Sequence, residues 1–169
     1  MDDVLNKARQ LLSELTPLRS DCGKTCGARC CRSMEGEETG MLLFPGEEED
    51  YLEKPGWKLR ETGSGVLAAC PGKCDRKERP LACRIFPLLP VIREDAVKVA
   101  ADERARAVCP LLRQGLRGMD PAFKDAVREA GRLLAEDPEQ REFLVMLTEE
   151  QDELKALREK LGGQGKTVI

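Results

Sequence analysis

Cysteine is the residue type in this chain with the greatest capacity for chemistry, since the sequence has eight cysteines and no histidine. They are Cys22, Cys26, Cys30, Cys31, Cys70, Cys74, Cys83 and Cys109. In a reducing compartment, cysteines clustered in this way are more often metal ligands than structural disulfides. The pattern therefore predicts metal binding by these cysteines, with disulfides and inert buried thiols as the alternatives.

The spacing of the first cluster, CGKTCGARCC at 22–31, supports this prediction. Side chains four residues apart on a turn or a helical face point the same way, so these thiols can approach one centre. Cys30 and Cys31 are adjacent and cannot both point in one direction on regular structure. They need an irregular backbone, or they serve two centres, or one of them bridges. Which cysteines share a centre is left open by the spacing.

The type of ligand limits which metals the site can bind. Thiolates select Zn²⁺, Cu(I) or iron–sulfur clusters over hard cations. Four of them complete a zinc site or hold one [4Fe-4S] cluster, so eight allow two centres or one centre with spare thiols. The all-cysteine ligand set favours a [4Fe-4S] cluster. The thin core, with 4% aromatic residues, and the lack of a nucleotide-binding motif favour Zn²⁺ as a structural support, which is the alternative.

Basic residues lie close to the cysteines in the sequence. They are Lys24, Arg29, Arg32, Lys73, Arg76, Lys77, Arg79 and Arg84. Such cations balance thiolate charge and lower the pKa of thiols. They could also bind an anionic substrate, or simply form a solvated basic face. Arg79 and Arg84 are the candidates for cofactor binding, whereas no catalytic residue is assigned and enzymatic activity is left open.

The segment 79–87, RPLACRIFP, is the most specific motif in the chain. Together with the paired Cys30 and Cys31, the apolar-then-acidic stretch 41–52 and the preceding Cys74, it resembles the YkgJ-type CxxCxxCC cysteine-cluster family. The resemblance covers about residues 20–110. It differs in the first motif, where three residues rather than two separate the cysteines. The family is described as a zinc- or iron-chelating domain, so the resemblance implies a metal more than any particular reaction.

Two functions follow from these features. One is an iron–sulfur protein that transfers electrons or assists a redox or protein-modifying enzyme. Some relatives in the family that the chain resembles are fused to, or resemble, protein lysine methylating enzymes, and others are described as iron–sulfur oxidoreductases. The other is a zinc-stapled protein-interaction module without catalysis.

The elements that must position the cysteines are expected to be mainly α-helical. Apolar residues at helical spacing predict a helix over 3–19, with its end uncertain at Pro17. For residues 20–110 we expect loops, short helices and up to two short strands. The apolar patches 41–44 and 87–92 are too short to separate strand from buried helix. The acidic run 47–50 is expected to be the solvated start of a short helix, or to pair with the basic stretch 73–79. The predicted fold is an irregular, loop-rich cysteine and metal core with an N-terminal helix and a C-terminal helical pair.

The C-terminal pair is signalled by Asp120-Pro121 and Asp137-Pro138, each an N-cap followed by proline at the first helical position. Apolar residues of coiled-coil type follow in the second helix, with Glu150 interrupting them. Their ordinary interpretation is packing on the cysteine domain; the alternative is a dimer or a protein partner bound through the C-terminal helices. The domains expected are 1–119 for the cysteine cluster, 120–162 for the helical extension and 163–169 for a disordered tail.

Composition sets the remaining limits. The 169 residues include 28 Lys and Arg against 31 Asp and Glu, a net charge of −3 that argues against general nucleic-acid binding. No run of about 18 apolar residues is present, so no membrane span is expected. The acidic N-terminus, MDDVLNKARQ, lacks the features of a signal peptide. The expected location is therefore the cytoplasm.

Overall fold

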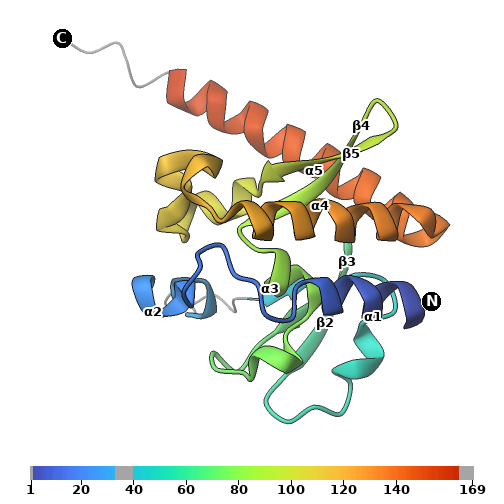
Figure 1. Cartoon of the computed structure of the whole chain (residues 1–169). Coiled ribbons are helices and arrows are strands. Elements are labelled where there is room, and N and C mark those ends of the chain that lie inside the picture. Colours follow the sequence, from blue (N-terminus) through green and yellow to red (C-terminus); the bar gives the residue numbers. More distant parts are fainter. Residues whose placement is uncertain (1, 33–39, 164–169) are drawn as a thin grey trace.

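The structure is a computed structural model that describes residues 2–32 and 40–163 (Figure 1). Within these residues, the helices are accompanied by five strands in two small antiparallel sheets. The expectation of a mainly α fold with a loop-rich core is therefore wrong, and the fold is a mixture of helices and sheets. The physical reason is that short segments between residues 40 and 101 pair with one another and satisfy their backbone groups as strands.

The first sheet contains β1 (Gly40–Leu42), β2 (Lys58–Thr62) and β3 (Gly65–Ala69) in the order β1-β3-β2. Its central strand places Ala68 opposite both Met41 and Leu59. Ala68 is buried, and it belongs to a small cluster with Leu43 and Tyr51. This sheet is the support for the loop that follows β3, where Cys70 and Cys74 lie.

The second sheet is a hairpin of β4 (Leu88–Arg93) and β5 (Ala96–Ala101). Its two-residue turn consists of Glu94 and Asp95, which have φ angles of 49° and 57°. Two successive positive φ angles give the twist that tight hairpins need, and glycine or asparagine usually supplies them. The turn lacks both residue types, which explains why the sequence signalled the apolar patch but not the hairpin.

The longer helices are α1 (Asp2–Leu11), α4 (Pro121–Glu136) and α5 (Pro138–Gly163). The start signals of the last two are confirmed, since the carboxylate of Asp120 accepts a hydrogen bond from Ala122 N and that of Asp137 accepts one from Gln140 N. The N-terminal helix is shorter than expected. A helix continuing through Pro17 would lose a donor there and would clash with the carbonyl four residues earlier.

Shorter helices complete the chain. They are α2 (Cys22–Cys26), α3 (Leu81–Ile85) and the 3₁₀ helices η1 (Arg29–Cys31), η2 (Glu48–Asp50), η3 (Arg76–Glu78), η4 (Glu103–Ala107) and η5 (Pro110–Gly118). Each of α2, α3 and η1 carries at least one cysteine, so the cysteine region is built from very short elements.

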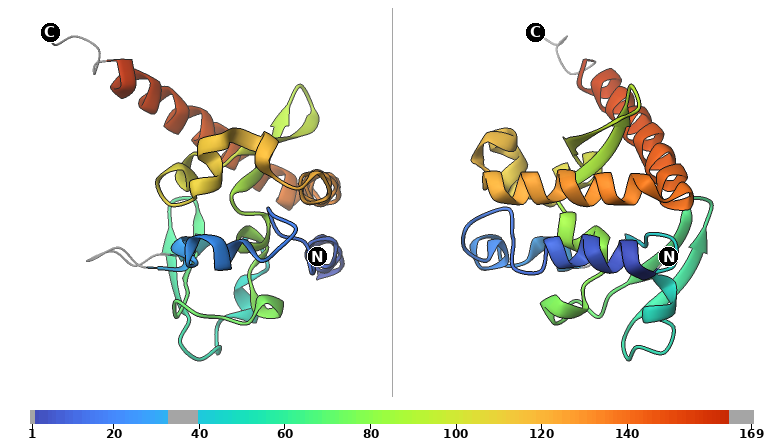
Figure 2. Two further views of the ribbon diagram at one scale, coloured as in Figure 1. Left: turned by 60° about the vertical axis from the view of Figure 1, so that its left-hand side comes forward. Right: turned by 45° about the vertical axis from the view of Figure 1, so that its right-hand side comes forward.

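The core lies where α4 meets α1 on one side and the β4–β5 hairpin with α5 on the other (Figure 2). Its largest fully buried apolar side chains include Phe44, Leu81, Phe123 and Leu144. Gly131 permits the close contact between α4 and the hairpin, because a Cβ at this position would lie 2.5 Å from the Cβ of Pro90. The buried core continues across the domain boundary expected between residues 119 and 120.

The C-terminal half of α5 projects beyond the rest of the fold (Figure 2). Phe143 and Leu147 near its start are buried in the core, whereas Leu154, Leu157 and Leu161 are exposed. Among the described helices, none combines the length and the apolar character needed to cross a membrane. Of the tail expected at 163–169, Gly163 ends α5 and the following residues lie outside the described part of the chain.

Candidate metal centre

Segments far apart in the sequence bring the eight cysteines into one region. The first four lie on α2 and η1, Cys70 and Cys74 follow β3, Cys83 lies on α3, and Cys109 immediately precedes η5. All eight are within the described residues and carry free thiols.

The first cluster owes its shape to an early break in the helix. The carboxylate of Asp21 caps α2 by accepting a hydrogen bond from Gly23 N at 3.0 Å. Gly27 and Ala28 then have φ angles of 67° and 53°, which reverses the chain before η1. Cys22 and Cys26 therefore share one short helix, while Cys30 and Cys31 belong to a separate turn. The two adjacent thiols have their Sγ atoms 4.0 Å apart.

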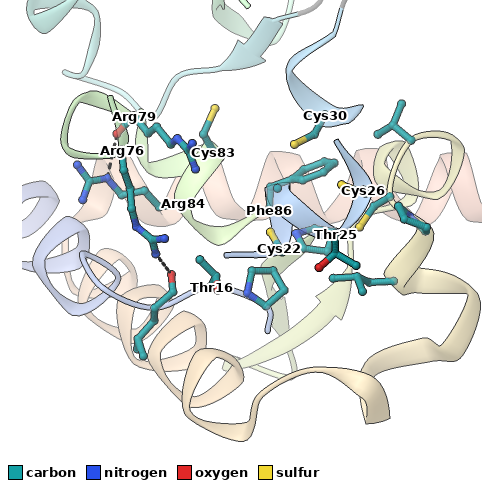
Figure 3. Close-up of a pocket in the computed structure, with 18 of the residues that line it drawn as sticks. Thr16, Cys22, Thr25, Cys26, Cys30, Arg76, Arg79, Cys83, Arg84 and Phe86 are labelled. Atoms are coloured by element: carbon teal, nitrogen blue, oxygen red, sulfur yellow. Dashed lines mark hydrogen bonds between the residues drawn. The ribbon is translucent and has the colours of Figure 1, made fainter. Parts of the chain in front are cut away.

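The cysteines line two neighbouring cavities of about 70 and 50 Å³. Both exceed the ~15 Å³ that one water molecule requires, so each has room for a small inorganic group. Cys22, Cys26 and Cys109 line only the first cavity, which Figure 3 shows in close-up. Another three line only the second: Cys31, Cys70 and Cys74. Cys30 and Cys83 line both.

The thiols lie in one region but do not surround a common point. Among residues 2–32 and 40–163, no three cysteine or carboxylate side chains are close enough together to hold one metal ion. Metal binding therefore requires the thiols of a cavity to move toward a common point. The short α2 and η1 and the loop at 70–74 are the segments that must adjust.

The electrostatics of the site disfavour the thiolate form of several of these cysteines, including Cys22, Cys30 and Cys83, by raising their pKa. Burial raises the pKa of Cys83 above its ordinary value, and the neighbouring Cys31 and Cys74 raise it further. Burial also raises the pKa of Cys22, with additional effects from Cys26 and other acidic neighbours. The hydrogen bond between Cys30 and Cys31 raises the pKa of Cys30 and lowers that of Cys31. A bound cation would offset this repulsion and release the protons.

Arg79 is the cation best placed to compensate thiolate charge, because it lines both cavities. Burial lowers the pKa of Arg79, but its hydrogen bond with Cys74 and the charges of Cys74, Cys31 and Cys83 outweigh that effect and raise it. Its Nε atom is buried and has no hydrogen-bond partner among the described residues. An unpaired buried donor beside a group of thiols is what a site for an anionic or thiolate-rich group requires.

Arg84 has a different environment, although it too lines the first cavity. Its guanidinium donates hydrogen bonds to the backbone carbonyls of Arg79, Arg9 and Lys77, at 2.9, 3.2 and 2.7 Å. These contacts connect α3 to α1 and η3. Because its donors are already used within the fold, we retain Arg79 alone for the proposals below.

The other basic residues near the cysteines either hold parts of the fold together or are exposed to solvent. Arg76 donates hydrogen bonds to the carbonyls of Ser13 and Leu15, so it anchors η3 to the segment after α1. The remainder are exposed: Lys24, Arg29, Arg32, Lys73 and Lys77. Sequence proximity to cysteine therefore did not distinguish the buried cation from the solvated ones.

Glu47 is a residue of this region whose role the sequence did not signal. Its carboxylate is fully buried and accepts hydrogen bonds from Phe44 N, from Leu81 N at the start of α3, and from Arg9. The expectation that the whole run 47–50 is solvated is thus wrong for Glu47. By satisfying the first backbone N–H of α3, Glu47 positions the helix that carries Cys83.

Comparison of this chain with family models, with curated proteins and with solved structures finds no match. The resemblance to the YkgJ-type family accordingly stays a prediction.

Proposed function

We propose that this chain is a metal-binding cysteine-cluster protein that carries an iron–sulfur cluster. It would serve in electron transfer, or as an accessory to a redox or protein-modifying enzyme in the cytoplasm. The observation that carries the proposal is the gathering of eight free thiols, from segments up to 87 positions apart, around two cavities that share Arg79. Fold formation alone does not require thiols from so many segments to meet.

The donor chemistry of the site fits such a group. Thiolates are the ligands that iron–sulfur clusters and Zn²⁺ prefer, and the cysteines supply enough of them for either. When bound, an iron–sulfur cluster supplies one-electron chemistry. The chain's own contribution is to provide the thiolates, to balance their charge with Arg79, and to limit water with apolar walls. Phe86 lines both cavities, and Met41 and Trp57 line the second.

The test is the content of iron, zinc and acid-labile sulfide per chain after anaerobic expression and purification, with the visible spectrum. Iron and sulfide in equal amounts with a brown colour are expected. Stoichiometric zinc without sulfide would show that the cysteines hold a zinc centre instead of an iron–sulfur cluster. A colourless chain that neither contains nor takes up either metal would overturn the proposal.

A zinc-stapled interaction module is the second candidate, and the projecting half of α5 favours it. Leu154, Leu157 and Leu161 are 38%, 54% and 63% exposed, which leaves an apolar stripe available to a protein partner or to a second copy of the chain. Sedimentation of the full chain and of a variant carrying Leu157→Glu and Leu161→Glu tests the second copy. A dimer that the variant abolishes would support the module, whereas two monomers would leave a different protein as the partner to be sought.

A further inference from the structure

We propose that the eight cysteines form two separate four-thiolate centres. The first consists of Cys22, Cys26, Cys30 and Cys109, and the second of Cys31, Cys70, Cys74 and Cys83. Each centre would take one thiophilic inorganic group, either a Zn²⁺ ion or an iron–sulfur cluster. This inference rests on the proposed function, since it assumes that the thiols bind metal, and it assigns which thiols act together.

The cavities give the main division. Cys22, Cys26 and Cys109 contribute to the first cavity and not to the second, whereas Cys31, Cys70 and Cys74 do the reverse. A single centre built from the whole first cluster, Cys22, Cys26, Cys30 and Cys31, would instead require thiols of both cavities to reach one point.

Cys83 belongs with the second set although it reaches both cavities. Among the thiols that interact electrostatically with it, Cys31, Cys74 and Cys70 of the second set outnumber Cys30 of the first. Figure 3 shows Cys83 beside Arg79, with Cys22 and Cys26 farther away around Phe86. Cys83 lines the second cavity together with Cys70 and Cys74 of the loop after β3.

Cys30 completes the first set. It lies with Cys22 and Cys26 in Figure 3, and it interacts with the Cys22 thiol as well as with those of Cys31 and Cys83. Consecutive side chains in a 3₁₀ turn are about 120° apart, so η1 can direct Cys30 to one cavity and Cys31 to the other. The paired cysteines are therefore the junction between the two centres.

Arg79 lies between the centres and acts on both. Its charge interacts with the thiols of Cys74, Cys31 and Cys83 in the second set and with Cys22 in the first. One half-buried guanidinium shared by two groups of thiols accounts for the position of Arg79 on the walls of both cavities.

The first experiment titrates the metal-free wild-type chain with Co²⁺ under anaerobic conditions. Thiolate-bound Co²⁺ absorbs in the visible and near-ultraviolet, so the absorbance reports binding directly. We expect the signal to saturate at two equivalents per chain. Saturation at one equivalent would overturn the two-centre arrangement and leave the proposed function standing. No thiolate-bound Co²⁺ at all would overturn both.

Two paired variants then test the assignment. Cys22→Ser with Cys26→Ser removes ligands of the first set, and Cys70→Ser with Cys74→Ser removes ligands of the second. Each pair should retain one equivalent of thiolate-bound Co²⁺, a twofold loss. A crossed variant, Cys22→Ser with Cys74→Ser, should retain no four-thiolate signal. The assignment would be overturned if either same-set pair lost all thiolate-bound Co²⁺ while its circular dichroism stayed unchanged. It would also be overturned if the crossed variant retained one full equivalent. The endpoint of the wild-type titration does not depend on how the variants fold.

Discussion

The carboxylate of Glu47 is completely buried and lies 2.7 Å from Nη2 of Arg9, a residue of α1 that is 38 positions away in the sequence. The Arg9 side chain is itself only 17% exposed. The pair holds the cysteine region against the helical core, because Glu47 also accepts the hydrogen bond from Leu81 N at 2.8 Å.

Replacing Glu47 with alanine should therefore be severely destabilising. Removing one partner of a buried ion pair leaves the other charge uncompensated, at a cost of about 3–5 kcal/mol. Urea unfolding followed by circular dichroism measures the change in the free energy of unfolding. Glu49, an exposed neighbour in the same 3₁₀ helix, is the matched control, and Glu49→Ala should change stability by less than ~0.5 kcal/mol. Equal effects of the two substitutions would contradict the role given to Glu47.

Gly131→Ala should destabilise the contact between α4 and the β4–β5 hairpin. The added Cβ would lie 2.5 Å from Pro90 Cβ and 2.9 Å from Val97 Cγ1, so backbone or side chains must shift. Overpacking of this kind costs about 1–3 kcal/mol. Gly162→Ala in α5 has nothing within 4 Å and should be neutral or slightly stabilising. Thermal unfolding of both variants makes the comparison, and a neutral Gly131→Ala would argue against the close approach.

Arg79 and Arg84 should differ in what they support. Arg79→Gln should weaken metal binding by about 10–100-fold, as loss of an outer-shell partner does, while the chain stays folded. Arg84→Gln should instead lower stability by about 2 kcal/mol, because three backbone carbonyls lose a charged donor. Metal affinity and denaturant midpoints are measured for each variant. Lys73→Gln, an exposed cation beside Cys74, controls for net charge and should change neither.

Glu103 should contribute stability that acid removes. Burial raises the pKa of Glu103, but hydrogen bonds from Arg106 and Arg158, at 2.7 and 2.8 Å, outweigh it and leave the pKa below its ordinary value. Because the folded pKa is depressed, the contribution is complete above the unfolded pKa of about 4.3 and is lost as the pH falls through the folded value. Glu103→Gln should thus be less stable than wild type at pH 7 by about 0.5–1 kcal/mol, and the difference should disappear well below pH 4. A difference that is independent of pH would contradict this linkage. Glu129→Gln, in an exposed pair with Arg132, is the control.

Metal removal should loosen the cysteine region and leave the helical core intact. A ligand that binds only the folded state stabilises the segments that hold it, and chelation withdraws that contribution. After metal removal, amide hydrogen exchange should accelerate in 22–31 and 70–83. The amides of β4 and α4 should keep their protection because their packing involves buried apolar side chains rather than thiols. Uniform acceleration throughout the chain would mean that the metal supports the whole fold.

Local interactions are what the sequence by itself determined. The starts of α4 and α5 were predictable because an aspartate cap and the following proline act within one helical turn. The need for an irregular backbone at Cys30 and Cys31 likewise follows from their adjacency, and residue type alone makes the eight thiols the candidate metal ligands.

Contacts between distant segments are what only the tertiary structure decided. Glu47 stands in a run of four acidic residues that are alike in sequence, and its burial depends on Arg9 and Leu81 reaching it from 38 and 34 positions away. The β4–β5 hairpin forms although its turn lacks the glycine or asparagine typical of two-residue hairpins. Packing of the hairpin against α4 and α5 compensates for the positive φ angles of Glu94 and Asp95. The division of the cysteines between two cavities has the same origin. Spacing determines which thiols share a turn. Which thiols line the same cavity is decided when α3, the loop after β3 and the start of η5 pack near α2.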